Sequence, residues 1–138
     1  MRTKKGVENS YKSPDDIDEM DWSLKTKNKA VFDYVQGLVR MRKAHPAFRM
    51  AKTVSIQAKL RFIENQLAGI IGYTLNGAAV SDSWKKIQVW FNGNSTAKKI
   101  TLKENRWKTA VLNNKFEEIN VDNEITLMPN SCVVIFKK

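Results

Sequence analysis

The acidic side chains of this 138-residue chain are most crowded between residues 15 and 21, where Asp15, Asp16, Asp18, Glu19 and Asp21 lie close together. Paired carboxyl groups can act as general acid and base, and carboxylates also bind calcium. Carboxylates crowded on one polar loop mostly repel each other or bind solvent, and no apolar neighbour here isolates one of them. The spacing also lacks the glycine and the terminal glutamate of a calcium loop. We therefore predict no catalytic residue and no metal site in this cluster.

Histidine and cysteine occur once each, as His45 and Cys132. A single cysteine excludes an internal disulfide and a multi-cysteine zinc site. Its apolar neighbours predict a buried structural thiol. His45 precedes Pro46 at the expected end of a helix, where a packing role is more common than a catalytic one. The chain as a whole is therefore predicted to contain no catalytic residue, no metal and no cofactor.

The composition is that of one folded domain with a strong positive charge. The formal net charge is +10, and 42% of the residues are hydrophobic. No apolar run reaches the roughly 18 residues of a membrane helix, no signal peptide is visible, and the compartment stays open. Basic chains can bind nucleic acid through phosphate contacts, but the lysines here are dispersed and no nucleic-acid motif accompanies them. We favour a solvated surface without nucleic-acid or membrane partners, and keep a basic nucleic-acid-binding β-domain as an alternative.

The first part of the chain predicts a loop followed by one helix. Residues 1–27 show no period of 3.6 or 2 and read as a long irregular loop. From Asn28 to Ala44 the apolar residues recur on one side, which predicts a helix that Pro46 terminates. The apolar face of this helix is broader than a surface helix needs, and no partner helix is expected elsewhere in the chain. We infer that its neighbour lies outside this sequence.

After residue 50 the pattern changes to that of short strands, preceded by a helical turn at residues 52–59. Turn residues such as Asn76-Gly77 and Asn92-Gly93 separate the apolar runs. The predicted strands are residues 60–64, 67–75, 86–92, 97–102, 106–112, 124–127 and 132–137. Strands at this spacing predict an antiparallel β-sandwich, so the fold class is expected to be mainly β.

Several phrases resemble one enzyme family over nearly the whole chain. They are the polar loop at residues 2–15, Met-Asp-Trp-Ser at 20–23, the helix end at 38–49, and the β-domain segments 82–89 and 91–94. Together they are similar to the C-terminal region of type I pullulanases, which are debranching members of the α-amylase superfamily of glycoside hydrolases. The first fifty residues carry the more specific part of the resemblance, because β-sandwiches are common.

The resemblance implies an architecture and a chemistry. Residues 1–48 would be the last loop and last helix of a catalytic (β/α)8 barrel, and residues 49–138 a C-terminal β-sandwich that stabilises the barrel. Such enzymes hydrolyse α-1,6 branch linkages of pullulan and starch- or glycogen-type glucans with retention. That reaction needs two carboxyl groups about 5 Å apart, and in the family they come from earlier barrel strands. The fragment itself is therefore expected to be non-catalytic, with the upstream barrel as its partner and an α-glucan bound in the parent's cleft.

The same resemblance implies that the loop lies beside the sugar cleft. The residues in family-like positions are Arg2, Asn9, Ser10, Tyr11 and Asp15. Their polar groups could bind sugar hydroxyls, and the ring of Tyr11 could stack on a sugar. Alternatively, these residues only brace the loop through backbone hydrogen bonds. Both interpretations stay open, and we expect residues 1–27 to be loosened where the barrel is absent.

A carbohydrate-binding β-sandwich without catalysis is the main alternative function. Trp84, Trp90 and Trp107 could then form a sugar-stacking surface, although tryptophans at strand positions are more often part of a core or of inter-domain packing. The sequence Asn94-Ser95-Thr96 fits a glycosylation pattern, for which chance is the better explanation.

Overall fold

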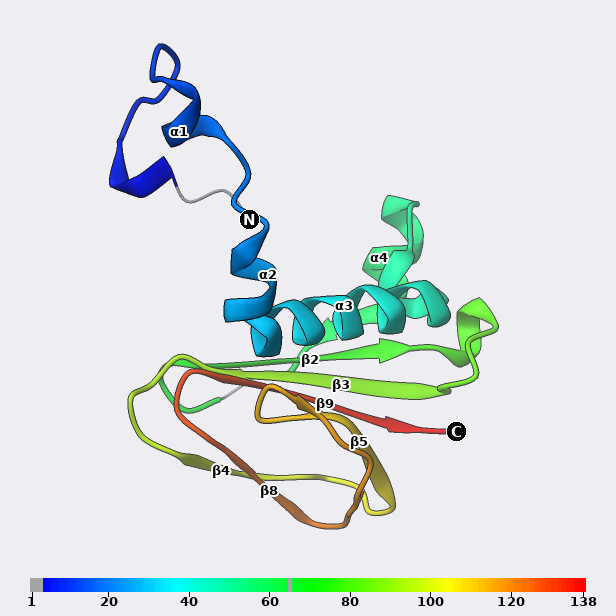
Figure 1. The fold of residues 1–138 in the computed structure, drawn as a ribbon. Helices are drawn as coiled ribbons and strands as arrows, with labels where there is room; N and C mark the ends of the chain where they lie inside the picture. Colours follow the sequence, from blue (N-terminus) through cyan, green and yellow to red (C-terminus); the bar gives the residue numbers. More distant parts are fainter. Residues whose placement is uncertain (1–3, 65) are drawn as a thin grey trace. The chain divides into compact units, whose positions relative to one another are not determined.

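The computed structural model of the chain describes residues 4–64 and 66–138 (Figure 1). The chain forms two compact units, the first ending at Gln36 and the second beginning at Gly37. The division falls inside helix α3 (Lys29–Ala44).

The first unit contains more regular structure than its sequence suggested. A 3-10 turn, η1 (Lys4–Gly6), is followed by α1 (Asp15–Asp18) and α2 (Ser23–Lys27) before α3 begins. The expectation of one irregular loop over residues 1–27 is therefore wrong. Acidic residues occupy the first turn of α1, where they suit the helix dipole, and Asp21 Oδ1 accepts the backbone N–H of Ser23 at 2.9 Å as α2 begins. Helices of four or five residues complete barely one turn, so they leave no period of 3.6 in the sequence.

Helix α3 lies where the apolar repeat predicted it. It ends at Ala44, and His45 takes an extended conformation before Pro46, as the restriction on residues preceding proline requires. None of its residues is buried. Val31, Val35 and Val39 follow one another at intervals of four, and each is about half exposed. The predicted apolar face is thus open only in part: Val31 and Val35 are exposed, whereas Leu38 and Met41 are partly buried.

The second unit is built on antiparallel strands, with η2 (Pro46–Arg49), α4 (Thr53–Lys59) and η3 (Ala78–Val80) between or before them. One sheet has the order β1-β2-β3-β9-β5-β6, with β7 also paired to β5; the other contains β4 and β8. The strands are β1 (Leu60–Phe62), β2 (Ile70–Asn76), β3 (Lys86–Asn92), β4 (Lys98–Thr101), β5 (Trp107–Leu112), β6 (Lys115–Phe116), β7 (Asn120–Val121), β8 (Glu124–Leu127) and β9 (Ser131–Lys137). All seven predicted strands are present, and only the two-residue strands β6 and β7 escaped prediction.

The two sheets form layers around one hydrophobic core, which confirms the predicted mainly β, sandwich-like fold. Figure 1 shows β4 and β8 on one side of β2, β3 and β9. The core cluster draws on both layers: Ile70, Trp90, Ile100, Leu102, Trp107, Val121, Ile125, Leu127, Val133 and Ile135. On β3, the even-numbered residues face this core, and the odd-numbered Ile87 and Val89 are buried against the opposite side.

Close packing in the core depends on one glycine. Gly72 lies directly across from Trp90 in the β2–β3 register. A Cβ atom at position 72 would stand 2.5 Å from the indole ring of Trp90. Only glycine lets this ring lie flat over the neighbouring strand.

Candidate functional site

The predicted substrate-contact residues lie in the first unit, and their bonds are mainly local. Asn9 Oδ1 accepts the backbone N–H of Tyr11 at 3.2 Å. Ser10 is only 2% exposed, and its carbonyl accepts the backbone N–H of Ser13 at 3.0 Å. These two contacts have the form of loop bracing. Asp15 is exposed at the start of α1, whereas Arg2 lies outside the described residues.

Two aromatic side chains of this unit are open to solvent. Tyr11 is 87% exposed and Trp22 is 71% exposed. A flat ring held in a polar segment can stack on a sugar. Trp22 was not among the predicted contact residues, although an isolated tryptophan in a charged segment was a usable signal.

The acidic cluster does not form a catalytic or metal-binding arrangement. Lys5 Nζ lies 3.4 Å from Asp16 Oδ2. The hydroxyl and backbone N–H of Ser23 bind Asp21 and hold the pKa of its carboxyl below the ordinary value. Across residues 4–64 and 66–138, no three histidine, cysteine or acidic side chains gather where they could hold a metal ion.

In the second unit, the end of α3 is tied to the sheet by a buried carboxylate. Asp82 is fully buried, and its Oδ1 lies 2.8 Å from Nδ1 of His45. Because an ionised carboxylate can only accept, the Nδ1–H of His45 donates this bond. Asp82 also accepts the backbone N–H groups of Ala47, at 3.0 Å, and Trp84, at 2.9 Å. We call these four residues the seam, because they join residues 45–47 to the β-domain.

The electrostatics of the seam favour the charged form of Asp82. Burial alone would raise the pKa of its carboxyl, but the hydrogen bond from His45 and those from Ala47 and Trp84 outweigh it. The pKa of Asp82 therefore lies below its ordinary value. His45 thus packs and donates a hydrogen bond, in agreement with the sequence prediction of a packing role.

The tryptophans of the β-domain do not form a sugar-stacking surface. Trp84 stacks on His45, with ring centroids 3.4 Å apart, and on Phe136, at 4.0 Å. Trp90 and Trp107 are buried in the core. The interpretation as core residues is confirmed for Trp90 and Trp107, whereas Trp84 is only partly buried and packs against His45 and Phe136.

A groove opens along the core-facing side of the large sheet, where the second layer ends. Its volume is about 840 Å³. Thr74 of β2 and Gln88 of β3 lie directly opposite each other on its floor, and Trp90 continues the floor. Ile63 lines one wall, and the other wall is formed by residues 99–104, which include Leu102 and Glu104. We call this the sheet groove; sequence reasoning missed it.

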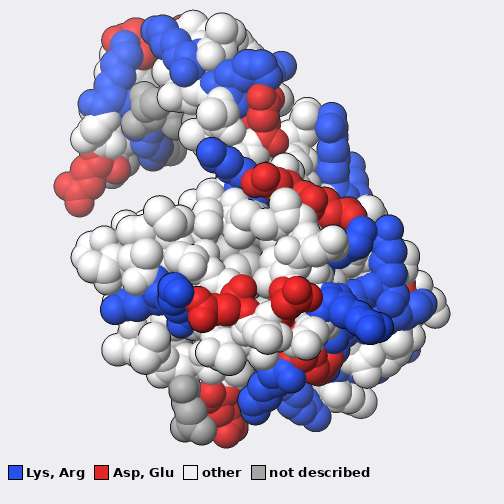
Figure 2. All heavy atoms as spheres, turned by 90° about the horizontal axis from the view of Figure 1, so that it is seen from below, with Lys and Arg blue, Asp and Glu red and all other residues white. Residues whose placement is uncertain are grey.

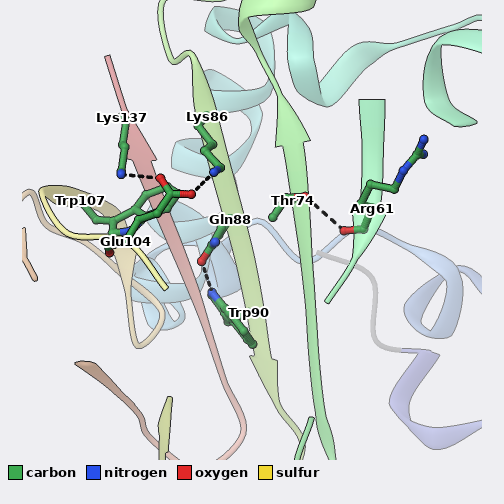
Figure 3. Close-up of polar contacts among 8 residues, drawn as sticks. All are labelled: Arg61, Thr74, Lys86, Gln88, Trp90, Glu104, Trp107 and Lys137. Atoms are coloured by element: carbon green, nitrogen blue, oxygen red, sulfur yellow. Dashed lines mark hydrogen bonds and ion pairs between the residues drawn. The ribbon is translucent and has the colours of Figure 1, made fainter. Parts of the chain in front are cut away.

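Figure 3 shows how the polar groups of the sheet groove are held. Gln88 Oε1 accepts the indole N–H of Trp90 at 3.1 Å. Glu104 lies between two lysines and accepts from Lys86 and, at 2.7 Å, from Lys137. The bonds from Lys137 and Lys86 lower the pKa of Glu104 below its ordinary value. The carboxylate therefore stays ionised and offsets cationic charge at this end of the groove.

Comparison with known proteins identifies the relationship. A family model described as "Pullulanase, all-beta domain" matches residues 56–115. The curated pullulanase of Bacillus subtilis (strain 168) is 41% identical over 89 residues, which are 64% of this chain and 12% of that protein. The solved pullulanase from Bacillus acidopullulyticus superposes with a TM-score of 0.90 and 32% identity, covering 99% of this chain and 17% of the other. The chain is related to the C-terminal region of pullulanases.

Other solved pullulanases match in the same way. The type I pullulanase from Bacillus subtilis str. 168, complexed with maltose, gives a TM-score of 0.90 at 28% identity over 98% of this chain and 19% of that chain. The pullulanase from Anoxybacillus sp. LM18-11, complexed with maltotetraose, gives 0.87 at 27% identity over 99% of this chain. Our chain spans between about an eighth and a fifth of the length of these pullulanases. The resemblance seen in the sequence is therefore confirmed.

The cysteine and the surface charges of this pullulanase-like region have ordinary environments. Burial raises the pKa of the Cys132 thiol to about 11, and the side chain is partly exposed where a buried thiol was predicted. Figure 2 shows lysine and arginine side chains interspersed with acidic ones on the face that it displays, and pairs such as Lys99 with Glu124 neutralise part of the charge. No helix within the described residues is long and apolar enough to cross a membrane.

Proposed function

We propose that this chain is the C-terminal part of a pullulanase that hydrolyses α-1,6 branch linkages in pullulan and in starch- or glycogen-type glucans. Residues 1–48 are the last loop and helix of the catalytic barrel, and residues 49–138 form the β-domain that supports it. The catalytic carboxylates of this retaining reaction belong to the upstream barrel. The chain alone is therefore non-catalytic.

The exposed apolar stripe of α3 carries this proposal. Val31, Val35 and Val39 follow one another along one face of the helix and leave half of each side chain in water. An apolar stripe of this kind is stabilised when a neighbouring element covers it. In a (β/α)8 barrel the outer helices pack against the barrel strands and against each other, and a last barrel helix needs such a stripe.

The loop residues complete the proposal on the substrate side. Arg2, Asn9, Tyr11 and Asp15 contribute to the rim of the cleft, whereas Ser10, which is only 2% exposed, braces the loop. The open ring of Tyr11 is the group best placed to touch a sugar. Its 87% exposure supports this role, as does the malto-oligosaccharide bound by the related Anoxybacillus pullulanase.

A hybrid enzyme tests the proposal. The matching region of the Bacillus acidopullulyticus pullulanase is replaced by this chain, and the release of reducing ends from pullulan is measured. We expect a hybrid that hydrolyses pullulan, whereas the isolated chain releases none. Robust hydrolysis by the isolated chain would refute the assignment of the catalytic groups to the barrel.

Two adjacent substitutions then test the stripe. Val35→Asp places a charge on the stripe, and Gln36→Asp places the same charge on the exposed polar side of the same turn. We expect Val35→Asp to lower the melting temperature and the pullulan activity of the hybrid, and Gln36→Asp to change neither appreciably. In the isolated chain the two variants should be nearly equally stable, because both side chains are exposed. Equal behaviour in the hybrid as well would contradict a covered stripe.

A further inference from the structure

We propose that the sheet groove binds a short α-glucan, so that this β-domain holds substrate chains in addition to supporting the barrel. The choice of an α-glucan rests on the proposed function. The site itself rests on the geometry of Thr74, Gln88 and the walls beside them.

The buried amide of Gln88 is the first observation. The residue is buried, with 9% of its surface exposed, and its Oε1 accepts the indole N–H of Trp90. No described residue accepts a bond from its Nε2. Because no fully buried side-chain nitrogen or oxygen in the described chain lacks a partner, this nitrogen must reach the open groove. Burial of an amide donor whose only outlet is the groove costs free energy unless water or a ligand accepts the bond.

The hydroxyl of Thr74 is the second observation. Thr74 pairs with Gln88 across the β2–β3 ladder, so the two side chains stand next to each other on the floor. Within the described chain its hydroxyl has one bond, a long one of 3.4 Å to the carbonyl of Arg61 (Figure 3). The floor therefore presents neutral donors and an acceptor side by side, which is the pattern that sugar hydroxyls match.

The charged groups and the apolar walls of the groove favour a neutral ligand that has an apolar face. Glu104 is matched by Lys86 and Lys137, and Lys103 and Glu64 are opposite charges elsewhere on the lining. Lys99, which also lines the groove, is paired with Glu124. Most of the charged groups here therefore already have partners, and a charged ligand would have to compete with these partners. Ile63, Leu67 and Leu102 supply apolar wall surface for the carbon face of a sugar ring. At about 840 Å³, the volume falls within the roughly 300–1,000 Å³ of small-molecule sites.

The affinity of the groove for a glucan should be weak, because no tryptophan ring in the groove is open for stacking. Trp90 is buried, so a glucan gains hydrogen bonds and aliphatic contact without stacking on this indole ring. We expect a dissociation constant of about 1 mM, typical of a few net hydrogen bonds on an open surface. A weak site of this kind can still raise the local concentration of a glucan when the same protein binds that glucan at a second site.

Nuclear magnetic resonance of the isolated chain with maltotetraose tests the inference. The indole N–H of Trp90 reports directly, because it donates to Gln88, and a Trp90→Phe variant assigns its signal. We expect saturable shifts of this signal and of backbone amides at 72–74, 86–90 and 100–104. Cellotetraose, which has the same number of glucose units in β-linkage, should give no saturable shift.

Two variants and one control make the test specific. Gln88→Glu keeps the acceptor for Trp90 but removes both amide donors, and Thr74→Val removes the hydroxyl at constant shape. Each should weaken binding by about three- to tenfold, as expected for one lost hydrogen bond. Thr126→Val makes the same change as Thr74→Val on an exposed position of β8 and should bind like the parent chain.

Three results would overturn the inference: no shift at saturating maltotetraose, equal binding of cellotetraose, or unchanged binding by both groove variants. Failure here is separable from failure of the proposed function. If the hybrid hydrolyses pullulan but the groove binds no maltotetraose, only the groove inference is refuted. If the hybrid is inactive but the groove binds maltotetraose, only the enzyme assignment is refuted.

Discussion

Replacement of Asp82 should be the most damaging single change that the seam allows. In Asp82→Ala, the backbone N–H groups of Ala47 and Trp84 and the ring N–H of His45 all lose their acceptor. Each buried donor left without a partner costs about 1–3 kcal/mol. His45 can turn toward solvent and Trp84 is only partly buried, so the sum is about 3–5 kcal/mol.

Unfolding of the isolated chain in a urea titration measures this loss of stability. A cost of that size should also lower the melting temperature by about 10–20 °C for a domain of this length. Asp82→Asn keeps one acceptor and should fall between the parent and the alanine variant. Asp122→Ala removes an exposed carboxylate between β7 and β8 and should change the free energy of unfolding by less than about 0.5 kcal/mol. A loss below about 1 kcal/mol in Asp82→Ala would refute the energetic role of the seam.

The pH dependence gives an independent check on the same carboxylate. The folded state holds the pKa of Asp82 below its ordinary value. Its contribution to stability is therefore complete above the unfolded-state pKa of about 3.9 and is lost as the pH falls through the lower folded-state pKa. The stability gap between the parent and Asp82→Asn should be constant near neutral pH and shrink in acid. A gap that widens on acidification would contradict the hydrogen-bond assignment.

Three further predictions follow from the geometry. Gly72→Ala should destabilise the chain by about 1–3 kcal/mol in urea unfolding, because its Cβ would press on the buried ring of Trp90; a neutral effect would show that the ring can move aside. Cys132 has a pKa of about 11, so it should react with a thiol reagent at neutral pH at least about 100-fold more slowly than a free cysteine. Its reaction rate should rise with pH up to about 11. Fast reaction at neutral pH would contradict the raised pKa. Tyr11→Ala in the hybrid enzyme should raise KM for pullulan about three- to tenfold through the loss of one stacking contact, whereas an unchanged KM would return Tyr11 to a bracing role.

Much of the β-domain could be predicted from the sequence because its longer strands either alternate, as β5 and β8 do, or form continuous apolar runs, as β3 and β9 do. Strand β5 shows the pattern clearly, with Trp107, Thr109 and Val111 buried and the residues between them less so. The two residues of β6 or β7 are too short to alternate, and they form only because β5 already offers an edge. Helices α1 and α2 were missed for a similar reason, since each completes barely one turn and leaves no repeat in the sequence.

The candidate sites were predictable to different degrees. The position of His45 before a proline indicated packing, but its partner Asp82 is 37 residues away, and no local pattern links them. The sheet groove could not be predicted either. Its shape depends on how far β4 and the residues after it extend over β2 and β3, and no local pattern encodes this distance. A hint was nevertheless present, since Lys86 and Gln88 interrupt the apolar side of an otherwise buried strand.

The seam also explains why the predicted domain boundary differs from the boundary between the two compact units. The resemblance to pullulanases implies a boundary at residues 48 and 49, whereas residues 37–48 belong to the same compact unit as the sheet. His45 and Ala47 make their decisive bonds to Asp82, so the end of α3 is held by the β-domain even without a barrel. In a complete enzyme the same residues would transmit the position of the β-domain to the last barrel helix.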